Sequence, residues 1–236
     1  TRGEEIGLVG ATNLDYSMIK AKESVVFDGN GPVNTITGAS PTYVGFDVAV
    51  KGRAAHAGVE PEKGLSAIRI ASDIISQLPN GRLDEETTFN VGTIAGGTVR
   101  NAVPSDATFS GEFRSRNTET LDLLRLDIEA IFEKARQKYS EATIDEQMEV
   151  MFHMYNLDPK DQIVKLVTRV MNELNLKPNI KPSGGGTDAN VMRFHGIDCI
   201  VVGMSTNEMH TINEYVVVPD LVNTAIFCQH VMTAIR

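Results

Sequence analysis

The sequence predicts an α/β domain that is interrupted by an inserted α+β domain. From Tyr43 onward, hydropathy patterns follow the order strand, helix, strand, strand, helix, strand, which is the ferredoxin-like β-α-β-β-α-β arrangement. On both sides of this region, short apolar runs end in glycine-rich turns and are accompanied by amphipathic helices, as in α/β domains. We therefore assign residues 1–40 and 154–236 to the outer domain and residues 41–153 to the inserted domain.

Composition limits the classes of function. The chain has 236 residues, of which 42% are hydrophobic and 22% charged, so it is globular and long enough for one large or two small domains. Its net charge of -9 argues against a nucleic-acid partner, and no apolar run reaches the ~18–20 residues that cross a bilayer. Cys199 and Cys228 lie in apolar contexts, which favours free thiols in a reducing cytoplasm over a disulfide bridge.

The first part of the chain predicts a helix over residues 5–21, with Leu8, Val9, Leu14, Met18 and Ile19 as its apolar positions. Residues 24–27 have the β-branched and aromatic content of a buried strand. The cluster from Asp28 to Pro32 should end this strand in a turn. Asp28 is then either a turn residue that bonds its own backbone or a carboxylate at the ligand-binding end of a strand.

The middle region begins with alternation of Val44, Phe46, Val48 and Val50, which predicts a half-buried strand. The other expected elements of this region are helices over residues 64–78 and 119–140 and strands over residues 88–94, 107–114 and 146–152.

The last part of the chain returns to α/β patterns. A helix is expected over residues 159–174, a glycine-rich turn over 182–188 and a closing helix over 220–235. The continuous apolar run of residues 199–202 predicts a strand that is buried on both faces.

Adjacent carboxylates at Glu4 and Glu5 suit acid-base or metal chemistry, although neighbouring glutamates are also common on solvated surfaces. His210 follows the buried strand, and histidine is the commonest protein metal ligand. An α/β sheet could gather Glu5, Asp28 and His210 at one edge. Three separate residues are not a motif, however, so the residues alone leave this site as one hypothesis.

The glycine-rich run from Gly184 to Asp188 permits two interpretations. Backbone N–H groups before a helix can bind a phosphate, but the run fits neither the Walker pattern nor the dinucleotide-binding fingerprint. A loop whose backbone approaches a substrate or metal suits the glycines better. The sequence contains no G-x-S-x-G elbow for a nucleophilic serine.

Several stretches together resemble one family. In chain order they are Thr-Arg-Gly-Glu-Glu-Ile-Gly-Leu-Val-Gly-Ala, Phe-Asp-Gly-Asn-Gly-Pro, Gly-Arg-Ala-Ala-His-Ala-Gly, Gly-Gly-Thr-Val-Arg-Asn-Ala-Val-Pro, Gly-Glu-Phe-Arg-Ser, Gly-Gly-Gly-Thr-Asp-Ala-Asn and His-Thr-Ile-Asn-Glu-Tyr. This ordered set resembles the dinuclear zinc exopeptidases and amidohydrolases, which include peptidase T, glutamate carboxypeptidase and the aminoacylases. The peptidase T-like branch is the most similar, and the resemblance covers essentially the whole chain.

The resemblance implies a zinc-peptidase catalytic domain, a mixed sheet with helices, into which an α+β lid and dimerisation domain is inserted. It implies two zinc ions, with cobalt or manganese as substitutes, and a homodimer formed through the lid. It also implies roles for individual residues. Glu4 would be the general base, Glu5 and His210 would bind one zinc, and Asp28 would bind the other. His56 would stabilise the oxyanion, and Asn101 and Arg114 would hold the substrate carboxylate. Gly185, Gly186 and Thr187 would line the bound substrate.

One departure from the family pattern affects the site. In the family, a histidine ligand, the aspartate that bridges the metals and a further aspartate come from a segment upstream of the Glu-Glu pair. The resemblance therefore implies that this chain is a fragment with an incomplete catalytic domain, an exposed sheet edge and exposed apolar helix faces.

We expect a cytoplasmic enzyme that hydrolyses peptide bonds in small peptides, as tripeptidases and aminopeptidases do. Two alternatives remain open at this point: an amidohydrolase that acts on N-acyl amino acids, and a non-catalytic dimerising fragment without a complete metal site.

Overall fold

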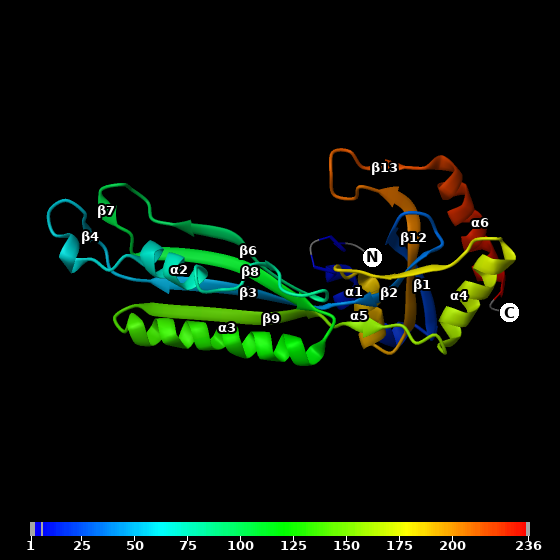
Figure 1. The fold of residues 1–236 in the computed structure, drawn as a ribbon, viewed down its shortest axis with the longest axis horizontal. Helices are drawn as coiled ribbons and strands as arrows, with labels where there is room; N and C mark the ends of the chain where they lie inside the picture. The colour runs from blue at the N-terminus through cyan, green and yellow to red at the C-terminus, as the bar shows by residue number, and fades with distance from the viewer. Residues whose placement is uncertain (1–2, 6, 235–236) are drawn as a thin grey trace. The chain divides into compact units, whose positions relative to one another are not determined.

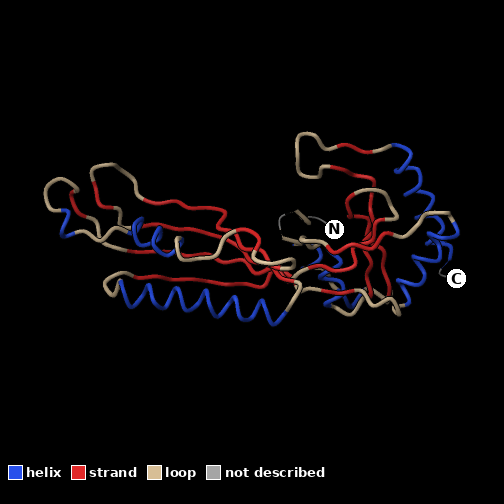
Figure 2. The backbone as a smooth tube through the Cα atoms, in the orientation of Figure 1, coloured by secondary structure: helices blue, strands red, loops and turns tan. Residues whose placement is uncertain are grey.

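The computed structural model describes residues 3–5 and 7–234 and divides into two compact units. Thr1, Arg2 and Ile6 of the Glu4-Glu5 motif, and Ile235 at the expected end of the last helix, lie outside the described residues. Unit 1 comprises Thr1–Pro41 with Phe152–Arg236, and unit 2 comprises Thr42–Met151. Figure 1 shows the elements of both units, and Figure 2 shows the loops that connect them.

Unit 1 contains a six-stranded mixed sheet in the order β1-β12-β2-β10, in which β11 also pairs with β2 and β13 with β12. Strands β1 and β12 are parallel, whereas β2 is antiparallel to β12. The elements of unit 1 are α1 (Val9–Thr12), β1 (Glu23–Asn30), β2 (Thr35–Ser40), β10 (Tyr155–Asn156), α4 (Gln162–Glu173), β11 (Asn179–Pro182), α5 (Asp188–Phe194), β12 (Asp198–Asn207), β13 (Tyr215–Val216) and α6 (Val218–Ala234), with a 3-10 turn at Tyr16–Met18.

Strand β12 is the centre of unit 1 and is buried on both faces, as its apolar run predicted. Ile200 and Val202 pack with residues of α4 and α6, whereas Cys199 and Val201 pack against Ala189 of α5. Since side chains alternate along a strand, one sheet face is covered by α4 and α6 and the other by α5. The two cysteines are free thiols, as expected, with Cys199 buried and Cys228 half-buried.

The N-terminal helix prediction is wrong. In place of one helix over residues 5–21, the chain forms the four-residue helix α1 and a 3-10 turn. Gly7 has a φ of 101° and Leu8 a φ of 59°, and a helix cannot pass through such left-handed residues. Asp15 then accepts a hydrogen bond from Ser17 N and begins the separate 3-10 turn.

The predicted turn at Asp28 is also wrong in its position, because β1 continues to Asn30. Parallel pairing with β12 supports the extension, since Gly29 lies opposite Gly203. The register shifts on both sides of Gly29, which marks a bulge in this part of the strand.

Unit 1 exposes one edge of its sheet and apolar residues of its last helix. Among the described strands, β1 pairs with β12 alone, so its other edge has no strand partner. Helix α6 buries Phe227 and Val231 but exposes Val218, Val222 and Met232. The helix is therefore apolar around most of its circumference.

Unit 2 has the predicted β-α-β-β-α-β order. Its main sheet runs β5-β6-β8-β3-β9, so the four long strands are arranged as in ferredoxin-like domains. The elements are β3 (Thr42–Lys51), β4 (Ala55–His56), a 3-10 turn (Pro61–Lys63), α2 (Ala67–Ile75), β5 (Gly81–Arg82), β6 (Thr87–Gly96), β7 (Ala102–Val103), β8 (Asp106–Ser115), α3 (Thr118–Lys138) and β9 (Thr143–Phe152).

One face of this sheet packs against α2 and α3, and α3 lies along it in Figure 1. The alternating residues Val44, Phe46, Val48 and Val50 are buried in that core, which confirms the predicted half-buried strand.

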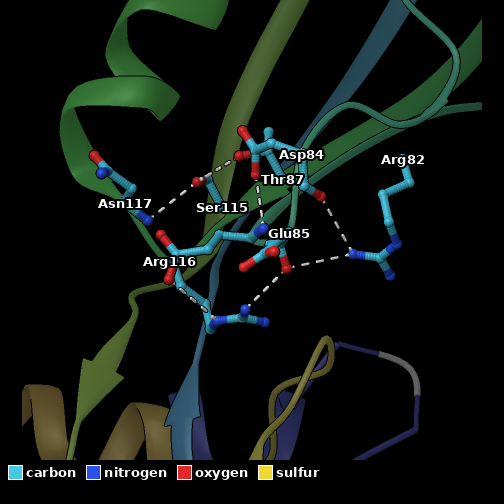
Figure 3. Close-up of polar contacts among 8 residues, drawn as sticks. Arg82, Asp84, Glu85, Thr87, Ser115, Arg116 and Asn117 are labelled. Carbon is cyan, nitrogen blue, oxygen red and sulfur yellow. Dashed lines mark hydrogen bonds and ion pairs between the residues drawn. The ribbon is translucent and has the colours of Figure 1, made fainter.

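Polar contacts fix the turn from β8 into α3 (Figure 3). The side chain of Asn117 caps the helix by accepting a hydrogen bond from Thr120 N at 3.1 Å. The backbone N–H of Asn117 donates to Ser115 Oγ at 3.0 Å, and Ser115 Oγ lies 2.9 Å from Thr87 Oγ1 in a buried hydroxyl pair. The end of β8 is thus tied both to β6 and to the start of the helix.

Candidate active site

Unit 1 contains a cavity of about 870 Å³, and all of its lining residues belong to that unit. Four segments that are distant in the sequence form it: the Glu4-Glu5 turn, the end of β1, the loop after β12 and the glycine-rich turn before α5. Polar faces of β2 and β11 complete the wall. In the sheet, the carboxyl end of the central strand β12 lies at this cavity, which is where α/β sheets place ligands.

Glu4 and Glu5 lie in a tight turn before α1. The carbonyl of Glu4 accepts hydrogen bonds from Gly7 N at 3.2 Å and from Leu8 N at 2.9 Å. Both glutamates line the cavity, where Glu4 is half-buried and Glu5 is exposed. The two neighbouring carboxylates therefore have different surroundings.

His210 lies in the loop between β12 and β13, close to Glu5. The distance from His210 Nε2 to Glu5 Oε2 is 3.6 Å. Two ligands of one tetrahedral zinc, each at about 2.0–2.2 Å from the metal, lie about 3.4 Å apart, so this spacing suits a shared ion. His210 has a φ of 65° and Glu208 a φ of 55°, and left-handed non-glycine residues often occur at functional sites.

Asp28 reaches the same cavity from β1. Its neighbour Gly29 packs against β12 so closely that a Cβ atom would lie 2.9 Å from the carbonyl carbon of Val202. Gly203 is tighter still, because its Cβ would lie 2.2 Å from the carbonyl oxygen of Pro32. Two facing glycines thus allow the backbones to approach and hold the Asp28 segment against the central strand.

The carboxylates of this region lie close to one another, and burial together with their negative charges raises the pKa of Glu4 and Asp28. Burial raises the pKa of Glu4 to about 7, with further contributions from the negative charges of Asp28, Glu5 and Asp188 and an opposing effect of His210. The pKa of Asp28 is also raised, first by burial and then by Glu5 and Asp188. Asp188 is buried, which raises its pKa, and its Oδ1 has no hydrogen-bond partner among the described residues.

These observations bear on whether the residues fit a metal. No group of three or more His, Cys, Asp and Glu side chains in residues 3–5 and 7–234 is arranged to hold an ion. The donor pair of Glu5 and His210, the carboxylate of Asp28 in the same cavity and the excess negative charge nevertheless fit divalent cations chemically. The cavity thus brings together oxygen and nitrogen donors of the kinds that divalent cations bind.

The glycine-rich turn forms one wall of the cavity, which Gly185, Gly186 and Thr187 line. Thr187 begins α5 in a capping box with Asn190. The carbonyl of Gly185 accepts a hydrogen bond from Ser40 Oγ at 2.9 Å. At Gly186, a Cβ atom would lie 2.3 Å from the ring of Phe152, so only glycine fits there.

His56 and Asn101 lie in unit 2, where β4 and β7 bring their backbones together. His56 pairs with Ala102, and the carbonyl of Asn101 accepts a hydrogen bond from Ala57 N at 2.9 Å. Gly58 N donates to His56 Nδ1 at 3.2 Å, so a neutral His56 ring carries its proton on Nε2. That N–H is a suitable donor to a developing oxyanion.

Arg114 does not join His56 and Asn101 within unit 2. Strand β8 begins at Asp106, shortly after β7, and Arg114 lies near its other end. The eight residues from Asp106 to Arg114 correspond to about 27 Å along the strand at ~3.4 Å per residue. Its Nε and Nη2 atoms bind Glu112 at 3.1 and 2.7 Å, and its guanidinium lies 4.4 Å from the ring centre of Tyr43. The expectation that Asn101 and Arg114 hold one carboxylate is therefore not met within a single copy of unit 2.

Several residues in the cavity or beside it were not assigned a role from the sequence. Asp188 was visible within the glycine-rich motif, but its burial was not predictable from the motif. Thr35, Thr37, Asn179 and Lys181 belong to strands β2 and β11, which were not predicted because their polar residues lack the usual apolar alternation.

An anionic cavity in a mixed α/β unit, with an α+β unit inserted between its two chain segments, is an architecture that known proteins share. Residues 39–140 match the model of the peptidase dimerisation domain of the M20 family. This match, together with the relatives described next, supports an M20 family peptidase.

Within this family the chain is similar to peptidase T proteins. It is 40% identical over 225 residues to the uncharacterized protein YqjE of Bacillus subtilis, covering 95% of this chain and 60% of that protein. It is 25% identical to peptidase T of Enterococcus faecalis, covering 90% of this chain and 52% of that protein.

Two solved structures share the fold over nearly the whole chain. Aminopeptidase PepT from Bacillus cereus has a TM-score of 0.85 and 36% identity and covers 98% of this chain and 62% of its own. A tripeptidase from Staphylococcus aureus has a TM-score of 0.89 and 28% identity and covers 99% of this chain and 63% of its own. The chain thus spans little more than half the length of these relatives.

Proposed function

We propose that the protein hydrolyses peptide bonds in small peptides with the aid of divalent metal ions. The observation that carries this proposal is the pairing of Glu5 with His210 beside Glu4 and Asp28 in one cavity. The similarity to an aminopeptidase and a tripeptidase supports peptides as the substrates.

In the proposed site, Glu5 and His210 hold one zinc ion and Asp28 holds the other, with cobalt or manganese as alternative metals. Bound ions of this kind polarise the scissile carbonyl and lower the pKa of a water molecule. Glu4 lies beside the ligands and acts as the general base, since a carboxylate outside the metal's ligand set can take a proton from water and pass it to the leaving amine. Gly185, Gly186 and Thr187 line the bound substrate.

The inserted domain supplies the second group of proposed residues. His56 donates its Nε2–H to the oxyanion, and Asn101, on the adjoining loop, contacts the substrate carboxylate end together with Arg114. Since Arg114 lies about 27 Å along β8 from this loop, the three residues act together only if His56 and Asn101 of one copy serve a site that contains Arg114 of another. This requirement supports a homodimer.

The outer edge of β6 is our candidate for the dimer contact. Strand β5 pairs only with Thr88 and Phe89, so the part of β6 that follows has no strand partner on this side among the described residues. Ile94 is 56% exposed there. An open edge with an apolar residue is a template for pairing with a second copy.

The two free thiols are consistent with a reducing compartment, and we propose a cytoplasmic location. No helix in the described ranges has the length and hydropathy needed to span a membrane.

Hydrolysis of a substrate panel tests the proposal. The protein expressed from its complete gene should release the N-terminal residue of tripeptides in the presence of Zn²⁺, and EDTA should remove this activity. Faster turnover of N-acyl amino acids would instead assign the site to an amidohydrolase. A protein that binds no metal and cleaves neither class would be a non-catalytic dimerising protein, contrary to the proposal.

A further inference from the structure

The cavity of unit 1 has a second, positively charged side. Four of its described lining residues carry carboxylates: Glu4, Glu5, Asp28 and Glu208. Lys181 is the one lysine or arginine among the described lining residues. In the part of the chain that the structure describes, no hydrogen bond or ion pair engages the ammonium group of Lys181. The cation therefore remains available to a ligand.

The sheet register places Lys181 on the same face as Val26 of β1. Lys181 pairs with Thr37, Thr37 with Val201, and Val201 with Val26, and residues that pair across a sheet share a face. Asp28 lies two residues after Val26 at the bulge of β1, so strand alternation does not place it, but it lines the same cavity as Lys181. The face that Lys181 shares with Val26 is the one covered by α5, and the opposite face carries the apolar core that includes Ile36.

The two sides of the cavity are separated by a peptide-sized distance. Strands β1 and β11 are three strand spacings apart in the order β1-β12-β2-β11, or about 14 Å at ~4.8 Å per spacing. An extended peptide advances about 3.3–3.6 Å per residue, so about four residues span this distance between the strand backbones. The space between is polar, since Thr35 pairs with Asn179 on the same face beside the Thr37–Lys181 pair.

We propose that Lys181 binds a carboxylate of the substrate while the scissile bond lies at the Glu4-Glu5 side of the cavity. This inference rests on the proposed function, because it takes a short peptide as the ligand. It assigns to the chain a preference for substrates with a negative charge away from the scissile bond. Such a charge is carried either by the C-terminal carboxylate or by an acidic side chain.

Arg114, the other cation proposed to contact the substrate carboxylate, is already paired with Glu112. Both carboxylate oxygens of Glu112 occupy the Nε and Nη2 atoms of Arg114, which is the bidentate geometry that a substrate carboxylate would require. Lys181 has no such competitor among the described residues, so it is the better placed of the two cations to receive a carboxylate in the structure as it stands.

Isothermal titration calorimetry with three peptides tests the proposal. The probes are trialanine, trialanine amide, and the amide of Ala-Glu-Ala, in which the only carboxylate is on a side chain. The titrations use the Glu4→Gln background with added Zn²⁺, so that turnover does not disturb the binding signal. In this background, trialanine or Ala-Glu-Ala amide should bind about 10-fold more tightly than trialanine amide, as a charge-assisted hydrogen bond predicts.

Lys181→Met should abolish this preference, and the probe whose affinity falls identifies the source of the carboxylate. Lys165→Met is the matched control, because Lys165 is an exposed lysine of α4 that does not line the cavity, and it should retain the preference. Thermal unfolding of both variants should match that of the parent, which excludes misfolding.

If Lys181→Met keeps the same preference among the probes, the proposal is overturned. It is also overturned if the Glu4→Gln protein with Lys181 intact binds all three probes equally or binds none of them. A failure of this proposal is distinguishable from a failure of the proposed function. If Lys181→Met hydrolyses tripeptides with an unchanged KM, the proposed function stands and the role of Lys181 is excluded. If the protein with Glu4 intact binds peptides through Lys181 but does not hydrolyse them, the role of Lys181 stands and the proposed function is excluded.

Discussion

Replacement of Glu4 by glutamine should lower kcat for tripeptide hydrolysis by about 10²–10⁴-fold in the protein expressed from its complete gene, with little change in KM. Glutamine keeps the size of the side chain but cannot take a proton from water. Because Glu4 is proposed to act on the reaction and not on substrate affinity, the loss should fall on kcat. Steady-state kinetics with saturating Zn²⁺ measures both parameters.

Glu208→Gln is the control for this variant. Glu208 lines the same cavity and loses the same charge on substitution, but it has no proposed part in the reaction. Its kcat should stay within a few-fold of the parent. A normal rate in Glu4→Gln would exclude the general-base role, and an equal loss in both variants would show that only the charge of the cavity matters.

The second large effect is expected from Gly203→Ala. The added methyl carbon would lie 2.2 Å from the carbonyl oxygen of Pro32 and 2.5 Å from that of Gly31, so the loop after β1 must move away from β12. Such overpacking should lower the free energy of unfolding by about 1–3 kcal/mol. Because Asp28 lies directly before this loop, zinc affinity should fall as well. Thermal unfolding and a zinc titration measure the two effects.

Gly184→Ala provides the matched comparison, since nothing lies within 4 Å of a Cβ at Gly184. This variant should keep both the stability and the zinc affinity of the parent. If Gly203→Ala behaves in the same way, the close approach of β12 to the Asp28 segment does not hold the site.

Sequence patterns predicted elements best where one or both faces of a strand are apolar. The alternation from Val44 to Val50 and the run from Cys199 to Val202 both correspond to buried strands. Strands β2 and β11 were not predicted, because β2 has Ile36 as its one large apolar residue and β11 is exposed throughout. Both strands carry polar residues on the face that lines the cavity. These polar residues make the cavity polar, and they also remove the apolar alternation by which hydropathy analysis finds a strand.

The candidate site was less predictable than the fold. Glu5 and His210 lie near opposite ends of the chain, and no local pattern indicates that their side chains are 3.6 Å apart. The resemblance to a family grouped them, whereas composition and spacing left them as separate residues. The helix predicted over residues 5–21 failed for a local reason: the left-handed conformations of Gly7 and Leu8 depend on a turn that the apolar pattern does not reveal.

The central claim is that the cavity of unit 1 binds two divalent cations, and anomalous diffraction at the zinc absorption edge tests it most directly. Crystals of the protein expressed from its complete gene and grown with Zn²⁺ should show two anomalous peaks in the cavity, one between Glu5 and His210 and one at Asp28. A cavity without anomalous peaks, or peaks that touch none of these three side chains, would contradict the claim.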